Sequence, residues 1–263
     1  MTNPQDESLK TELSRIEAMI KSPKTRNLRE RVVDSSIYVR PKFASTLLLI
    51  DRSSDEPKVL MGKRNKSLKF MPGALVFPGG SVDRSDGNIE SVGELHTNVE
   101  QRIANALRSK ATPKRGRSLA LAAVREVAEE SGLLLGKPGV FSSQNPQWAD
   151  FSKHEIVPDI AQLRLFGRAV TPPGMPRRFD TWFFLADKSV IGHVPQGGFD
   201  PDGELEDLQW ISPMDAINGP TREITRVLLV ELMNRLQNDP GLEVSYPAPQ
   251  YMVKSKSFTR SEI

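Results

Sequence analysis

The sequence predicts an α/β domain with helices on both faces of a mixed sheet, and three observations support this. Strand-like runs alternate with amphipathic helical segments along most of the 263 residues. Their order is not a regular strand–helix–strand series, which favours a mixed sheet over an all-parallel one. The hydrophobic fraction of 38% is enough for one sizeable core. One core domain over residues 41–240, with an N-terminal helical extension at 1–40 and a tail at 241–263, fits best.

The composition limits the chemistry that the chain can perform. It contains no cysteine, which excludes disulfides, thiolate-bound zinc, iron–sulfur clusters and thiol nucleophiles. Its three histidines, at 96, 154 and 193, lack the spacing of an all-histidine metal site. Any bound metal should therefore be held mostly by oxygen. The net charge of +3 is too small to indicate nucleic acid as a partner.

The chain shows no expected membrane segment. Its longest apolar runs are far shorter than the roughly 20 residues that span a bilayer. The first residues lack the charged-then-apolar layout of a signal peptide. We therefore expect a cytoplasmic protein that does not bind membranes.

The first third of the chain predicts a helix, a hairpin and a tight turn. Apolar positions in 7–21 form a helical stripe, which is a candidate contact for a homodimer. Residues 44–50 form a strand by length and composition, with 58–63 as its hairpin partner. The apolar segment 70–80, broken by prolines and closed by a glycine pair, predicts a strand that ends in a tight turn.

The remainder predicts further helices and strands. Ser118 is the expected N-cap of a long helix over 119–134, which Gly136 and Pro138 terminate. The basic segment 110–117 is interpreted either as a cover for phosphates or as a solvated loop. Beyond Pro240 we expect irregular structure. The other predicted elements are helices at 98–110, 213–217 and 221–238 and strands at 162–170, 179–186 and 208–211.

Three glutamates on the predicted long helix carry the chemical signal. Glu126, Glu129 and Glu130 stand at i, i+3 and i+4, so their carboxylates leave one face of the helix. Like charges at this spacing cost helix stability, by a few tenths of a kcal/mol per pair. Convergent carboxylates are the ligands that Mg²⁺ or Mn²⁺ requires. A solvated acidic face is the alternative interpretation, and it would be the better one if no other motif accompanied the three glutamates.

The surroundings of the triplet resemble the signature of the Nudix hydrolases. That signature is Gly, five residues, Glu, seven residues, then Arg-Glu-U-x-Glu-Glu-x-Gly-U, where U is a bulky aliphatic residue. Residues 125–133 match its second half at every specified position, and Phe-Pro-Gly-Gly at 77–80 matches the turn that opens its first half. The resemblance implies a Nudix-type α/β/α sandwich and covers about 70–134.

The chain departs from the signature in two ways. Asp86 stands where the family has a glutamate, one methylene shorter but still a carboxylate. Between Asp86 and Arg125 lie 38 residues instead of seven, which is an insertion of 31, at about 87–117. Because the closure entropy of a loop grows only logarithmically with its length, the insertion can bulge outward without moving the carboxylate face.

The resemblance implies roles for the matched residues. It makes Glu126, Glu129 and Glu130 metal ligands together with the backbone carbonyl of Gly79, with Mg²⁺ or Mn²⁺ as cofactor. It gives Arg125 a structural role in orienting a carboxylate. The implied chemistry is metal-assisted hydrolysis of a diphosphate, with Glu129 or an acid of a later loop accepting a proton from water. Glu204 and Glu206 are the candidates for that later acid.

Residues outside the signature suggest a small-molecule nucleotide-type substrate. Segments 70–83 and 177–184 are similar to those of the coenzyme A diphosphatases of peroxisomal type and their bacterial relatives, although the fuller coenzyme A-associated pattern is absent. Coenzyme A or acyl-CoA is therefore the first expected substrate. The predicted substrate-binding residues, in each case with a surface or core role as the alternative, are Arg64, Lys66, Lys69, Phe70, Arg177, Arg178 and Trp182.

Two other functions stay open at this point. The same chemistry could act on ADP-ribose, NADH or a dinucleoside polyphosphate. A Nudix-like domain could also be a ligand sensor without catalysis, which Asp86 and the insertion allow but the full carboxylate set argues against.

Overall fold

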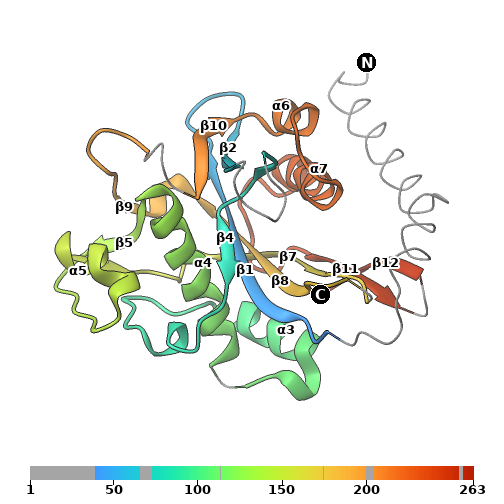
Figure 1. Ribbon diagram of the computed structural model, residues 1–263, viewed down its shortest axis with the longest axis horizontal. Helices are drawn as coiled ribbons and strands as arrows, with labels where there is room; N and C mark the ends of the chain where they lie inside the picture. The colour runs from blue at the N-terminus through green and yellow to red at the C-terminus, as the bar shows by residue number, and fades with distance from the viewer. Residues whose placement is uncertain (1–38, 66–72, 113, 174, 200–203, 255–256) are drawn as a thin grey trace.

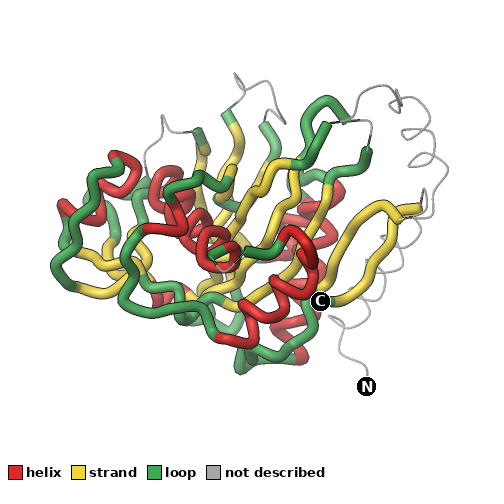
Figure 2. Tube along the Cα trace, turned by 90° about the horizontal axis from the view of Figure 1, so that it is seen from below, coloured by secondary structure: helices red, strands yellow, loops and turns green. Residues whose placement is uncertain are grey.

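The computed structural model describes residues 39–65, 73–112, 114–173, 175–199, 204–254 and 257–263. A mixed sheet lies at the centre, and helices cover both of its faces (Figures 1 and 2). This confirms the predicted α/β class with a mixed sheet. The predicted helix at 7–21 lies outside the described residues.

The central sheet has the strand order β10-β2-β1-β8-β7-β11-β12, with β3 beside β2 and β4 beside β1. Strands β1 and β8 run parallel and so do β7 and β11, whereas the other pairs are antiparallel. The strand bounds are β1 (Lys42–Asp51), β2 (Lys58–Arg64), β3 (Leu75–Val76), β4 (Gly79–Ser81), β7 (Arg164–Val170), β8 (Phe179–Asp187), β10 (Leu205–Ile211), β11 (Pro249–Lys254) and β12 (Ser257–Glu262).

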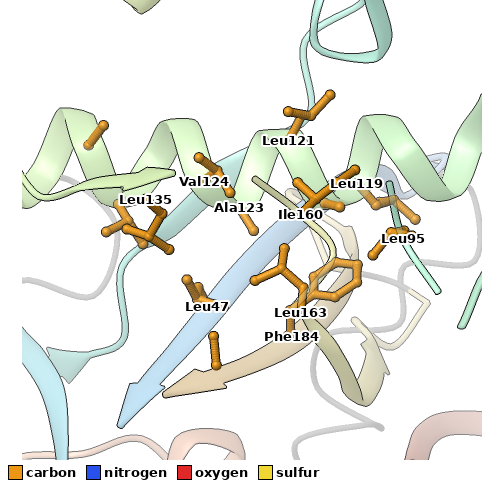
Figure 3. Close-up of a cluster of buried hydrophobic side chains, with 14 of the residues drawn as sticks. Leu47, Leu95, Leu119, Leu121, Ala123, Val124, Leu135, Ile160, Leu163 and Phe184 are labelled. Atoms are coloured by element: carbon orange, nitrogen blue, oxygen red, sulfur yellow. The ribbon is translucent and has the colours of Figure 1, made fainter. Parts of the chain in front are cut away.

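One face of the sheet is covered by α3 (Thr97–Leu107), α4 (Arg115–Ser131) and α5 (Ala149–Lys153). Leu47 and Leu49 of β1 point to this face and pack against apolar residues of α4 (Figure 3). Helix α4 ends at Gly132, whose φ of 72° is left-handed and therefore favours glycine. A small sheet of β5 (Leu134–Pro138), β6 (Ile156–Pro158) and β9 (Ile191–His193) follows beside it.

The other face is covered by α6 (Pro213–Asn218) and α7 (Glu223–Asn238). Leu48 and Ile50 of β1 point this way and pack in a second core cluster with α7. The alternation along β1 follows from the two-residue period of a strand. Because apolar side chains leave it on both sides, β1 is buried between the two helical layers.

Three predictions need correction. Ser118 is not the N-cap, because α4 begins at Arg115 and the Ser118 hydroxyl donates to the carbonyl of Lys114 within the helix. The helix does not extend to 134, because α4 ends at Ser131 with Gly132 as its C-cap, and Gly136 and Pro138 lie in β5. The tail beyond Pro240 is not irregular throughout, since β11 and β12 extend the central sheet.

The insertion is a packed element. Its helix α3 agrees with the helix predicted at 98–110, and three of its apolar residues, Val99, Ile103 and Leu107, are buried in the core with α4. The basic segment that follows is held by local contacts. Arg117 binds Glu94 and the carbonyl of Ile89, Lys114 donates to Asn88 at 2.8 Å, and Arg115 lies over the ring of Phe43.

Candidate active site

The site begins where strand β4 crosses helix α4. Gly79 pairs with Thr46 of β1, and Gly80 pairs with Ser45. A Cβ at Gly80 would collide with the Glu126 carboxylate, and a Cβ at Gly79 would collide with the side chain of Thr46. Only residues without a side chain allow strand and helix to approach this closely.

The three glutamates of α4 surround this glycine pair. Glu126 and Glu129 each accept a hydrogen bond from Nη1 of Arg125 at 2.8 Å. Glu130 accepts one from the backbone N–H of Gly79 at 2.9 Å. Glu129 is the most exposed of the three side chains, at 33%, against 14% for Glu126. The structure therefore brings the predicted metal ligands together against the Gly79–Gly80 backbone.

A buried ion pair between Arg125 and Asp86 lies next to the glutamates. Nε of Arg125 donates to Oδ1 of Asp86 at 2.9 Å, and its Nη2 donates to Oδ2 at 3.2 Å. Nη2 also donates to the carbonyl of Ser81 at 2.8 Å. Both side chains of the pair are at most 2% exposed. Arg125 thus ties the loop after β4 to α4 and at the same time fixes two of the glutamates.

The predicted late-loop acid also reaches this cluster. Glu204 lies immediately before β10 and forms an ion pair with Nη2 of Arg64 at 2.8 Å. Its charge acts on both Glu126 and Glu130. Glu206, the other candidate, lies in β10 opposite Lys63. Of the two, the structure places Glu204 with the carboxylates.

Burial and mutual repulsion raise the pKa values of the inner carboxyls. Desolvation raises the pKa of Glu126 to about 7, with Arg125 opposing and Glu129 and Glu204 adding to the shift. Desolvation raises the pKa of Glu130 to about 8, opposed by the Gly79 N–H and increased by Glu126 and Glu204. Burial alone would lower the pKa of Arg125, but the Asp86 hydrogen bond and the surrounding carboxylates raise it overall.

The donor set fits a hard divalent cation. Within the described ranges no three His, Cys, Asp or Glu side chains are preassembled around one ion position. The geometry explains this, because the carboxylates point to the nearest N–H donors of Arg125 and Gly79. Mg²⁺ and Mn²⁺ prefer charged oxygen ligands, and these carboxylates supply them beside a glycine backbone that carries no side chain.

The other predicted substrate-binding residues are dispersed. Arg178 donates hydrogen bonds from Nε to the carbonyl of Thr171 at 3.1 Å and from Nη1 to the carbonyl of Val39 at 2.8 Å. Arg177 is exposed, whereas Trp182 is completely buried and belongs to the core. Lys66, Lys69 and Phe70 lie outside the described residues.

A cavity of about 780 Å³ was not anticipated from the sequence. It adjoins the C-terminal end of α4 at Leu133 and contains none of the predicted site residues. Its walls come from four separate segments, so no local motif could have marked it. Its lining is mainly apolar, with ion-paired charges, and includes Arg52, Asp187, Lys188, Ile191, Phe199 and Trp210.

Comparisons with known proteins show which proteins this chain is similar to. No protein-family model matches the chain. It is 30% identical over 176 residues to putative nudix hydrolase 7 of Caenorhabditis elegans, covering 61% of this chain and 48% of that protein. The crystal structure of a NUDIX hydrolase from Alicyclobacillus acidocaldarius is similar with a TM-score of 0.57 and 27% identity, covering 73% of this chain and 91% of that one. The chain is therefore similar to Nudix hydrolases in sequence and in fold.

The name of a second curated relative includes a substrate. The chain is 25% identical over 214 residues to the acyl-coenzyme A diphosphatase NUDT19 of Xenopus laevis, covering 63% of this chain and 55% of that protein. The chain thus spans about half the length of both curated relatives. The resemblance seen in the sequence is confirmed, and so is the mixed α/β fold. In the described part of the chain, no helix is long and apolar enough to span a membrane.

Proposed function

We propose that the chain hydrolyses a diphosphate linkage in a nucleoside diphosphate joined to another group, with Mg²⁺ or Mn²⁺ as cofactor. The observation that carries this proposal is the excess of carboxylates around the Gly79–Gly80 backbone. The three glutamates of α4 lie close together. Arg125 binds Glu126 and Glu129 but is already paired with Asp86, and Glu130 accepts a hydrogen bond from the Gly79 N–H. Buried negative charge of this kind needs a cation, and a diphosphate brings the negative charge that such a cation would bind.

The roles of the residues follow from their positions. Glu126, Glu130 and the carbonyl of Gly79 would hold the cation, with Glu129 completing the carboxylate set. When bound, the cation stabilises charge on the phosphoryl oxygens and favours ionisation of an attacking water. Arg125 holds the glutamates in place through Asp86 and Ser81.

Two acids can accept the proton from the attacking water. Glu129 is the most exposed carboxylate of the helix, so solvent can reach it. Glu204 lies outside α4, immediately before β10, and forms an ion pair with the guanidinium of Arg64. We assign the general base to Glu129 and give Glu204 an electrostatic role, because Glu204 is already ion-paired.

Coenzyme A and acyl-CoA are the substrates that we propose first. The name of the Xenopus relative supports them, and so does the similarity of 70–83 and 177–184 to the coenzyme A diphosphatases. The apolar cavity near Leu133 offers a surface for the non-nucleotide part of such a substrate. ADP-ribose, NADH and dinucleoside polyphosphates share the diphosphate and are the alternatives within the same chemistry.

The test is a hydrolysis assay across these compounds with Mg²⁺ and with Mn²⁺. Each of coenzyme A, an acyl-CoA, ADP-ribose, NADH and diadenosine polyphosphates is incubated with the full chain, and the products are separated and quantified. We expect metal-dependent cleavage, fastest for the coenzyme A compounds. Binding of these ligands without turnover of any would overturn the enzyme and favour a sensor.

A further inference from the structure

The hydroxyl of Ser45 has no partner although it is completely buried. Ser45 is 0% exposed in the middle of β1, and its Oγ has no hydrogen-bond partner in the structure as described. An unsatisfied buried hydroxyl costs about 1–3 kcal/mol. Serine is also a weaker strand former than the aliphatic residues that follow it in β1. Packing therefore does not explain a serine at this position.

The strand register directs this hydroxyl toward the Glu126 carboxylate. Ser45 pairs with Gly80 across the antiparallel β1–β4 ladder. Paired residues project to the same face, with Cβ positions about 4.5–5.5 Å apart. The position of the missing Gly80 Cβ is occupied by the Glu126 carboxylate. The Ser45 side chain and this carboxylate are thus neighbours on the face that α4 covers.

The other neighbour of Ser45 on this face is Trp182, its partner in the parallel β1–β8 ladder. The indole Nε1 of Trp182 is also buried without a partner. Ser45 therefore lies between a carboxylate that carries excess charge and an indole that can only donate. Because an indole N–H cannot accept, only the carboxylate of these two neighbours can accept a hydrogen bond from the serine O–H.

We propose that Ser45 is a positioning residue whose hydroxyl donates a hydrogen bond to the Glu126 carboxylate when that carboxylate turns to a divalent cation. This inference rests on the proposed function. In the structure one Glu126 oxygen is bound by Arg125 at 2.8 Å. A hydrogen bond from β1 would hold the carboxylate in its ligand orientation without adding a charge. Such outer-shell partners typically change metal affinity by about 10-fold or more.

The test compares Mn²⁺ affinity with the stability of the metal-free protein. Mn²⁺ is titrated by calorimetry into the wild-type chain, Ser45→Ala, Ser45→Thr and Ser152→Ala. Ser152 of α5 is the matched control, because its hydroxyl is also buried without a partner but lies on a different element. The melting temperature of each variant is measured in chelator.

We expect Ser45→Ala to bind Mn²⁺ about 10-fold more weakly, while its metal-free melting temperature stays equal or rises. Ser45→Thr keeps the hydroxyl and should bind within about twofold of wild type, as should Ser152→Ala. Unchanged affinity in Ser45→Ala would overturn the proposal. Equal weakening in Ser45→Ala and Ser45→Thr would do the same, since it would show that packing matters and not the hydroxyl.

The design separates this inference from the proposed function. Glu130→Gln is included as a reference for loss of a metal ligand. If the wild-type chain itself fails to bind Mn²⁺, the metal site and the Ser45 role fall together. If the wild type binds, Glu130→Gln does not and Ser45→Ala matches the wild type, only the role of Ser45 is wrong.

Discussion

Two buried arginine–aspartate pairs in this protein look alike but differ in what surrounds them. Arg168 and Asp180, on β7 and β8, are joined by two hydrogen bonds of 2.7 Å, and the remaining donors of Arg168 meet Ala106 and Gln250. Arg125 and Asp86 are joined in the same two-pronged way. Around the first pair the charges balance. Around the second pair Glu126 and Glu129 share the same guanidinium.

The difference separates a purely structural ion pair from one that belongs to the proposed metal site. A balanced buried pair is satisfied within the fold and fastens α3 and β11 to the sheet. A buried cation shared by several carboxylates leaves carboxyl groups that are costly to ionise in the metal-free fold. The protein retains these groups although their ionisation costs stability, which is expected where an external cation completes the site.

The largest expected effect comes from removing the aspartate of each pair. Asp180→Asn leaves Arg168 buried without a counter-ion and should lower the free energy of unfolding by about 3–5 kcal/mol. Asp86→Asn should cost clearly less, about 1–2 kcal/mol, because Glu126 and Glu129 still neutralise Arg125. Urea denaturation measures both. Equal losses in the two variants would contradict the claim that the pairs differ in charge balance.

Mn²⁺ binding by the same variants sharpens this comparison. Asp180→Asn should keep wild-type affinity, whereas Asp86→Asn should weaken binding, because Arg125 would then compete harder for Glu126 and Glu129. Equal affinities in both variants would show that the Arg125–Asp86 pair has no part in the metal site.

The pH dependence of stability tests the excess charge itself. Burial raises the pKa of Glu130 in the fold from its ordinary value of 4.5 to about 8. Between these pH values the unfolded chain ionises while the folded chain keeps its proton, so the free energy of unfolding of the metal-free protein falls as the pH rises from about 5 to 8. Glu130→Gln cannot ionise and keeps an acceptor for Gly79.

We expect Glu130→Gln to exceed the wild type by about 3 kcal/mol at pH 8 in chelator and to match it near pH 5. The measurement is urea denaturation at both pH values. Glu56→Gln, at an exposed position, is the control and should follow the wild type throughout. A constant difference between wild type and Glu130→Gln at the two pH values would contradict the raised pKa.

The exposed glutamate tests catalysis without a large structural cost. Glu129→Gln should lower kcat for the best substrate by about 100-fold or more, as expected for loss of a general base, and should change the melting temperature little. Glu94→Gln is a matched control, because Glu94 is exposed and also binds an arginine, Arg117. Full activity of Glu129→Gln would move the base to Glu204.

The smallest effect is expected at the two neighbouring arginines. Arg177→Ala should raise KM by up to about fivefold with unchanged melting temperature, since an exposed cation contributes at most about 1 kcal/mol to a contact. Arg178→Ala should instead lower the melting temperature, because its guanidinium binds the carbonyls of Thr171 and Val39. The reverse pattern would assign substrate binding to Arg178.

Much of the fold and the main part of the site could be predicted from local sequence patterns. The spacing of Glu126, Glu129 and Glu130 fixes their common helical face, and short apolar runs at 44–50 and 179–186 indicate β1 and β8. Each of these patterns lies within a single helix or strand, so it can be recognised in the sequence before the fold is known. Ser118 is a good cap residue, so the sequence places the start of the helix after it. In the structure α4 already begins at Arg115.

The rest depends on contacts between distant segments. The pairing of Ser45 with Gly80 and the approach of Glu204 to Glu130 arise only when strands take their places in the sheet. The tail was misjudged for the same reason, since β11 forms by pairing with β7. No sequence pattern within residues 249–262 indicates that β7 is the strand with which they pair.

The central claim is that the excess carboxylate charge on α4 serves metal-dependent hydrolysis of a diphosphate. The most direct measurement is the rate of coenzyme A cleavage by the full chain after chelation and again after Mg²⁺ or Mn²⁺ is returned. We predict no cleavage in chelator, recovery with either cation in the wild type, and no recovery in Glu130→Gln. An equal rate in chelator, or full recovery in Glu130→Gln, would contradict the claim.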